Sequence, residues 1–168
     1  YIIITYDTGK PTINNIKDSM GRVITFVTTD DPDKRLSQIK VKNYDGSHDV
    51  IYNYSVGKFS NGYYRLTSFT PPGLPATSFE YYDGSSNHYE LTKVTTSYGG
   101  MLEYSYVNHD FYFKNICLDS RVVSQKKITF NAGEQAKVWN YTYPSYNGST
   151  SGTVNIQGPE FNSNVTHY

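Results

Sequence analysis

The sequence of 168 residues contains one cysteine, no excess of either charge, and no long apolar run. Cys117 can form no internal disulfide and belongs to no zinc-binding spacing, so we expect it to be a buried apolar residue. Because 15 basic side chains balance 15 acidic ones, we expect no nucleic-acid partner. The longest apolar run, around Ile2 to Ile4, is too short for a membrane span.

Catalytic and metal-binding patterns are also missing. The acidic cluster of Asp30, Asp31 and Asp33 lacks the spacing and the closing Glu of a calcium loop, so we expect a solvated turn. No Gly-x-Ser-x-Gly elbow occurs, and no histidine signature surrounds Cys117, so the sequence predicts neither an enzyme nor a cofactor. The histidines stand too far apart to predict a metal site: His48, His88, His109 and His167.

The residues that are abundant favour β-structure. The chain has 18 Tyr, 8 Phe and 1 Trp but few straight-chain helix formers. Apolar residues alternate with polar ones in many segments, as in Val50, Tyr52 and Tyr54, and turn pairs such as Gly99-Gly100 and Asn147-Gly148 separate these segments. We therefore expect an all-β fold of successive antiparallel hairpins, with a β-sandwich as the alternative.

Several segments between the expected strands have the composition of loops. Three prolines predict a loop over residues 70–76 that joins strands at 64–69 and 77–82, and a second loop is expected at 28–34. Residues 108–120 have the least regular pattern of the interior. Residues 158–168 are expected to be a polar tail or a connection to further sequence. Because the chain starts at Tyr1, we also expect it to be an excerpt or a processed form.

An irregular repeat runs through the chain. Each copy consists of a strand that begins near an Arg or Leu, a glycine turn, and a second strand rich in aromatic residues. The period is about 25 to 31 residues, as expected for stacked hairpins whose loops differ in length. The four copies occupy residues 35–54, 65–82, 91–106 and 121–143.

These units, together with the segment from Asp18 to Phe26, resemble the Rhs or YD-repeat family over residues 13–158. The Tyr-Asp pair of the family occurs at Tyr6-Asp7, Tyr44-Asp45 and Tyr82-Asp83. Members wind a long hairpin sheet into a hollow shell, which in bacterial toxins encloses a C-terminal toxic segment. The resemblance implies that residues 1–157 form a coiling hairpin array, a non-catalytic shell wall in a secreted or surface-delivered bacterial protein. Its partners would be the rest of the same polypeptide and the enclosed cargo.

The aromatic residues allow two interpretations. They could stack on sugar rings, which would make the chain a carbohydrate-binding or surface-binding module. They could instead pack across neighbouring strands on the inner face of the wall, and we favour this second interpretation. The residues concerned are Tyr52, Tyr54, Tyr81, Tyr82, Tyr104, Tyr106, Trp139, Tyr141 and Tyr143.

Overall fold

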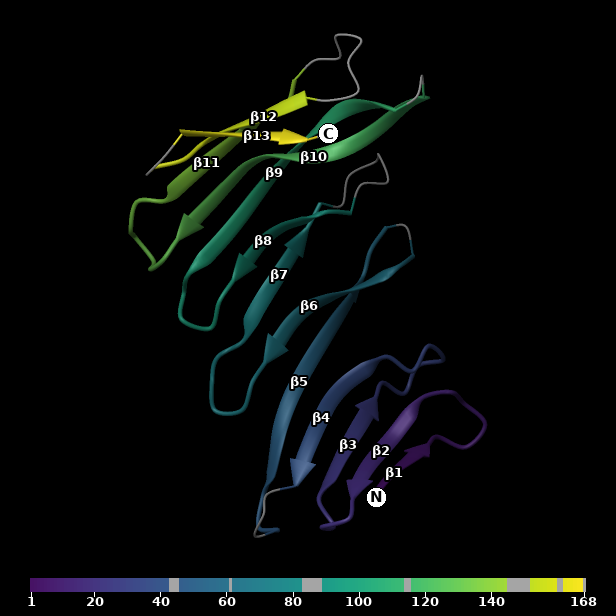
Figure 1. Ribbon diagram of the computed structural model, residues 1–168. Coiled ribbons are helices and arrows are strands. Elements are labelled where there is room, and N and C mark those ends of the chain that lie inside the picture. The colour runs from purple at the N-terminus through teal and green to yellow at the C-terminus, as the bar shows by residue number, and fades with distance from the viewer. Residues whose placement is uncertain are drawn as a thin grey trace. The chain divides into compact units, whose positions relative to one another are not determined.

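The computed structural model describes residues 1–42, 46–60, 62–82, 89–113, 116–144, 152–159 and 162–167. The regular elements among these residues are all β-strands, and they fall into two compact units, residues 1–78 and 79–168. Within each unit the strands follow one another in chain order, and the described pairings are antiparallel (Figure 1). The expected all-β fold of successive antiparallel hairpins is therefore confirmed.

Unit 1 contains β1 to β6 and the first two residues of β7. The loop expected at residues 70–76 is confirmed, because β6 ends at Thr70 and β7 begins at Thr77. The loop expected at 28–34 is confirmed in the same way by the interval between β3 and β4. The strands are β1 (Ile2–Tyr6), β2 (Ile13–Asp18), β3 (Val23–Thr28), β4 (Leu36–Lys42), β5 (Asp49–Lys58), β6 (Tyr64–Thr70) and β7 (Thr77–Tyr81).

Unit 2 contains the rest of β7 and six further strands, two of which are longer than the sequence suggested. Residues 108–120, expected to be irregular, lie in β9 and β10, which pair from Met101↔Thr129 to Phe113↔Ile116. Neither Gly nor Pro interrupts residues 101–129, so a mixed pattern of side chains does not stop the strands. The strands are β8 (Leu91–Thr95), β9 (Met101–Phe113), β10 (Ile116–Thr129), β11 (Lys137–Thr142), β12 (Gly152–Gln157) and β13 (Asn162–His167).

The polar stretch at residues 158–168 includes a strand that the sequence pattern does not predict. β13 pairs with β12 over six residue pairs, from Gly152↔His167 to Gln157↔Asn162. Its sequence, Asn-Ser-Asn-Val-Thr-His, has a single aliphatic residue, so hydrophobic alternation does not identify it.

Three hairpin tips share one turn and one short sequence, Ser-x-Gly. In each tip the backbone N–H of the glycine donates to the carbonyl three residues earlier, and the glycine has a positive φ of 82° to 84°. A side chain at that φ would be strained, so the glycine fixes where each strand reverses. Backbone hydrogen bonds close the three turns by joining residue 18 to 22, residue 59 to 63 and residue 96 to 100.

Each unit has one apolar and one polar face. Residues directly opposite one another in the register lie on the same face, and the faces alternate along each strand. The apolar face of unit 1 comprises Ile16, Ile24, Phe26, Ile39, Val41, Tyr52, Tyr54 and Phe69. The apolar face of unit 2 comprises Val94, Leu102, Tyr104, Ile128, Trp139, Tyr141, Val154 and Ile156.

No second sheet packs on these faces within either unit, as far as the described residues show. Thr129 and Val154 of unit 2 are the residues buried from solvent in the described part of the chain, and the apolar faces are half-exposed. A globular domain normally covers such a face with another layer. The two apolar faces are therefore the surfaces that need an explanation.

One hairpin of unit 1 recurs in unit 2 at a distance of 87 residues. Ser37-Gln38 of β4 corresponds to Ser124-Gln125 of β10, and both strands have a bulge at the serine. The facing strands carry Asn53 and Asn140, each between two aromatic residues. Each asparagine accepts a hydrogen bond of 2.9 Å from the glutamine amide opposite it. The repeat is thus visible both in sequence and in side-chain bonding.

Candidate functional site

The aromatic cluster of unit 1 lies on neighbouring strands β5 and β6. The ring of Phe69 stacks against Tyr52, with centroids 6.3 Å apart and planes 6° apart, and lies 5.2 Å from the ring of Tyr54. Tyr54 and Phe69 are direct partners in the register, so the contact follows from strand pairing. All three side chains are half-buried, which leaves part of each ring accessible from the apolar face.

Four of the candidate aromatic residues of unit 2, Tyr104, Tyr106, Trp139 and Tyr141, lie on β9 and β11, with β10 between them. The rings of Tyr104 and Tyr106 are 6.4 Å apart. Lys126 of β10 stands between Tyr104 and Trp139 in the register, and its Nζ lies 5.3 Å from the centroid of the Trp139 ring. This cation–π contact allows an ammonium group to occupy a face that is mostly apolar. Tyr141 continues the row and faces Ile156 of β12.

Two tyrosine hydroxyls of unit 2 bind backbone rather than solvent. Tyr106 donates to the carbonyl of Leu91 at 2.8 Å, and Tyr143 donates to the carbonyl of Val123 at 3.0 Å. Burial raises the pKa of both phenols above the ordinary value. The ring of Tyr143 also lies 5.3 Å from that of His109. These two hydroxyls hold the sheet together, so their contacts favour a packing role.

Tyr81 is the last residue of β7, and Tyr82 follows it. Tyr81 is half-buried, whereas Tyr82 is exposed and its backbone N–H donates to the carbonyl of Glu90 at 2.9 Å. The guanidinium carbon of Arg121 lies 6.0 Å from the Tyr82 ring centroid, and Arg121 Nε lies 3.1 Å from Glu90 Oε1. Tyr82 thus belongs to a polar cluster and not to the Tyr104 row.

Arginine–aromatic contacts also hold unit 1, and the sequence analysis did not identify them. The guanidinium carbon of Arg35 lies 3.5 Å from the ring centroid of Tyr64. The same side chain bonds Asp31 at 2.6 Å and Asp33 at 2.7 Å, so two acidic residues of the 28–34 loop neutralise an arginine. The signal was present in the sequence, because Arg35 opens one of the repeat copies.

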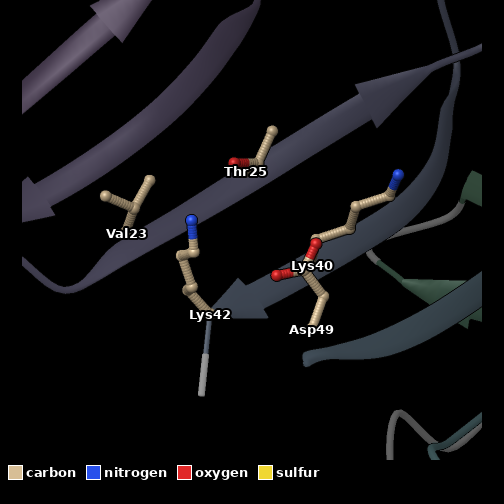
Figure 2. Close-up of a pocket in the computed structure, with 5 residues that line it drawn as sticks. All are labelled: Val23, Thr25, Lys40, Lys42 and Asp49. Atoms are coloured by element: carbon tan, nitrogen blue, oxygen red, sulfur yellow. The ribbon is translucent and has the colours of Figure 1, made fainter. Parts of the chain in front are cut away.

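A shallow depression lies on the polar face of unit 1. Figure 2 shows its lining residues, which come from three neighbouring strands. Two lysines, one aspartate and one threonine surround it, but nothing in their arrangement resembles a catalytic pair. The five residues are Val23, Thr25, Lys40, Lys42 and Asp49.

The described part of the chain contains neither a cluster of metal ligands nor a membrane-spanning helix. Within the described ranges, no three His, Cys, Asp or Glu side chains come together in a way that could hold a metal ion. The same part of the chain has no helix that could cross a membrane. Some predicted features lie wholly or partly outside the described residues: His88, Tyr44-Asp45, Tyr82-Asp83, Asn147-Gly148 and the side chain of Cys117.

No protein-family model matches the chain, and no curated protein matches it either. The function must therefore be argued from the two half-exposed apolar faces and their aromatic residues.

Proposed function

We propose that the chain is a non-catalytic wall segment of a bacterial YD-repeat shell that encloses a C-terminal toxin or effector. The observation that carries the proposal is the half-exposed apolar face of each unit, built by hairpins that follow one another in chain order. Exposed apolar area of this kind marks a surface that another part of a molecule covers. In a shell, the enclosed cargo and neighbouring wall would cover it.

The division of side chains between the faces supports a wall with an inside and an outside. Tyr52, Tyr54 and Phe69 lie on one face of unit 1, whereas Asn53 and Gln38 lie on the other. Each large ring contributes about 1.5 to 3 kcal/mol when it is fully covered. The polar face can stay in water without losing stabilisation of this kind. By the family resemblance, the protein would be secreted or delivered to the cell surface.

Protease protection in the full gene product that carries this segment tests the proposal. Tyr54→Lys would place a charge on the apolar face, and we expect the enclosed C-terminal segment to become cleavable. Asn53→Lys is the matched control, because the neighbouring residue on the opposite face should tolerate a charge without loss of protection. Equal protease sensitivity of the wild type and both variants would contradict containment.

A carbohydrate-binding or surface-binding module is the second candidate. The half-exposed Trp139 ring beside Lys126 favours it, because an indole face next to a cation suits a polar ligand with an apolar side. A glycan array and a titration followed by Trp139 fluorescence test this function. Saturable binding that disappears in Tyr104→Ala and Tyr141→Ala variants would support the module over the wall.

A further inference from the structure

Three lysines surround the depression on the polar face of unit 1. Lys40 and Lys42 line it from β4, and Figure 2 shows the ammonium group of Lys42 extending toward β3, where the hydroxyl of Thr25 lies. Lys17 of β2 borders the depression, because it is the register partner of the lining residue Val23. The depression has a volume of about 190 Å³. Positive charge is therefore concentrated around one small hollow of the sheet.

These three lysines are also electrostatically unpaired. None of them forms an ion pair with a carboxylate among the described residues. In unit 2, by contrast, Lys93 bonds Glu80 at 3.1 Å, and Lys126 lies over the ring of Trp139. Like charges that share one face of a sheet repel each other, and a bound anion would remove that cost. The equal numbers of basic and acidic side chains in the whole chain conceal this local excess.

We propose that the depression binds a phosphate group, either free or as a monoester. The one acidic lining residue is Asp49, which lies opposite Lys42 in the register. Three ammonium groups and one carboxylate leave two positive charges, and a phosphate monoester carries a charge of about −1.5 to −2 at pH 7. Lysine ammonium groups donate hydrogen bonds and phosphate oxygens accept them, so the chemistry of the donors also matches.

Strand pairing places the donors around one point. Lys40 lies directly opposite Thr25, and Lys42 follows on the same face, about 7 Å further along β4. Lys17 and Lys42 flank Val23 from the strands on either side of β3, about 10 Å apart at their backbones. Long, flexible lysine stems allow the ammonium groups to converge on one oxyanion. Because this face is opposite to the apolar one, the proposal does not rest on the containment function.

A titration of the 168-residue chain followed by NMR tests the site. Inorganic phosphate should shift the backbone amide signals of Thr25, Lys40 and Lys42 saturably, with a dissociation constant of about 1 mM, whereas potassium chloride at equal ionic strength should not. Glucose 6-phosphate is the second probe and distinguishes the two sources of the phosphate group. Tighter binding of the ester identifies a monoester as the ligand, and equal binding identifies the phosphate group alone.

Two variants with opposite expected effects separate a specific site from a general loss of structure. Lys42→Gln should raise the dissociation constant about three- to tenfold, because it removes an attractive charge. Asp49→Asn should lower it about threefold, because it removes the competing carboxylate, and a misfolded variant would not bind more tightly.

Lys58→Gln is the matched control, because it makes the same charge change on β5, about 30 Å along the strand from Asp49. Its dissociation constant for phosphate should equal that of the wild type. The proposal would be overturned by the absence of a saturable shift, by equal shifts with chloride, or by affinities that stay unchanged in both Lys42→Gln and Asp49→Asn.

Discussion

In unit 1 the central rows of the apolar face consist of uncharged side chains, whereas in unit 2 Lys126 stands in the same face beside Trp139. The units also differ at their hairpin tips. Asp18 in unit 1 caps its turn by accepting from the backbone N–H groups of Met20 and Arg22. At the corresponding tip of unit 2, the hydroxyl of Thr96 donates to the carbonyl of Gly100, and tyrosine hydroxyls tie neighbouring strands together, as Tyr106 does at Leu91. One hairpin pattern is thus stabilised by two different sets of polar contacts.

The largest difference between the units should appear when an aromatic ring is removed from unit 1. Phe69→Ala deletes the ring that contacts both Tyr52 and Tyr54, and we expect the free energy of unfolding to fall by about 2 kcal/mol. Hydrogen exchange should show the loss of protection in β5 and β6, while β9 and β10 stay protected. Urea denaturation measures the total effect.

The control for this prediction is Phe130→Ala in unit 2, because Phe130 is 57% exposed. Removing an exposed ring should change the free energy of unfolding by less than about 0.5 kcal/mol. Equal loss of protection in both units after Phe69→Ala would show that the two units unfold together and would remove the basis for comparing them.

A smaller effect is expected from a glycine that supports the aromatic row of unit 2. A methyl group on Gly158 would lie 2.5 Å from Cδ1 and 2.6 Å from Nε1 of Trp139. Gly158→Ala should therefore displace the indole and lower the free energy of unfolding by about 1 to 2 kcal/mol. Because Trp139 is the single tryptophan, its emission reports the displacement directly.

Gly57→Ala in unit 1 provides the comparison, since its new methyl would lie 2.8 Å from Cγ2 of Thr67, the end of a side chain. We expect no change in the Trp139 emission for this variant. An unchanged emission spectrum in Gly158→Ala would mean that the ring does not rest on the glycine.

The hairpins of the fold could be predicted from the sequence because alternation and turn residues act locally. Val50, Tyr52 and Tyr54 alternate in the sequence and lie on one face in the structure. Long-range contacts such as that of Arg35 with Tyr64 depend on which strands become neighbours, so alternation alone cannot reveal them. β13 was not predicted, because it pairs with β12 through backbone hydrogen bonds, which polar residues form as well as apolar ones do.

The candidate aromatic residues were predicted as one set, but the structure divides them by environment. Tyr52 and Tyr54 meet Phe69, whereas Tyr82 lies near Arg121. The sequence could not show this division, because it depends on which strands become neighbours and on the register in which they pair, as Tyr54 does with Phe69. Whether the accessible rings bind a ligand or cover cargo stays a prediction.

Acid should loosen the tips of unit 1 before those of unit 2. Hydrogen bonds from Asn14 and Thr12 lower the pKa of Asp7, and the hydrogen bond from Thr29 is the main cause that lowers the pKa of Asp31. A carboxyl group whose pKa is lowered by folding stabilises the fold above its unfolded pKa of 3.8, and this contribution is lost as the pH falls further.

Hydrogen exchange near pH 3, compared with pH 6, measures this difference at the tips. We expect faster exchange, after correction for the intrinsic rate, at residues 7–12 and 29–35 than at residues 96–100. The turn at 96–100 begins with Thr96, which does not titrate, and so serves as the internal control. Equal acceleration at all three tips would show that acid acts on the whole fold and not on the carboxylate caps.

The smallest expected effects concern the hairpin that both units share. Gln38→Ala and Gln125→Ala each remove an exposed hydrogen bond of 2.9 Å, so each should lower the free energy of unfolding by about 0.5 kcal/mol. Double-mutant cycles with Asn53→Ala and Asn140→Ala isolate the two pair energies. Equal coupling in both units would mean that the hairpin is stabilised in the same way despite its different surroundings. If the coupling energy of Gln125 with Asn140 is the larger one, the neighbouring strand is the cause, because Gln157 of β12 lies opposite Asn140 and extends the row of amide side chains. The energy of the pair would then depend on its neighbours as well as on the local sequence.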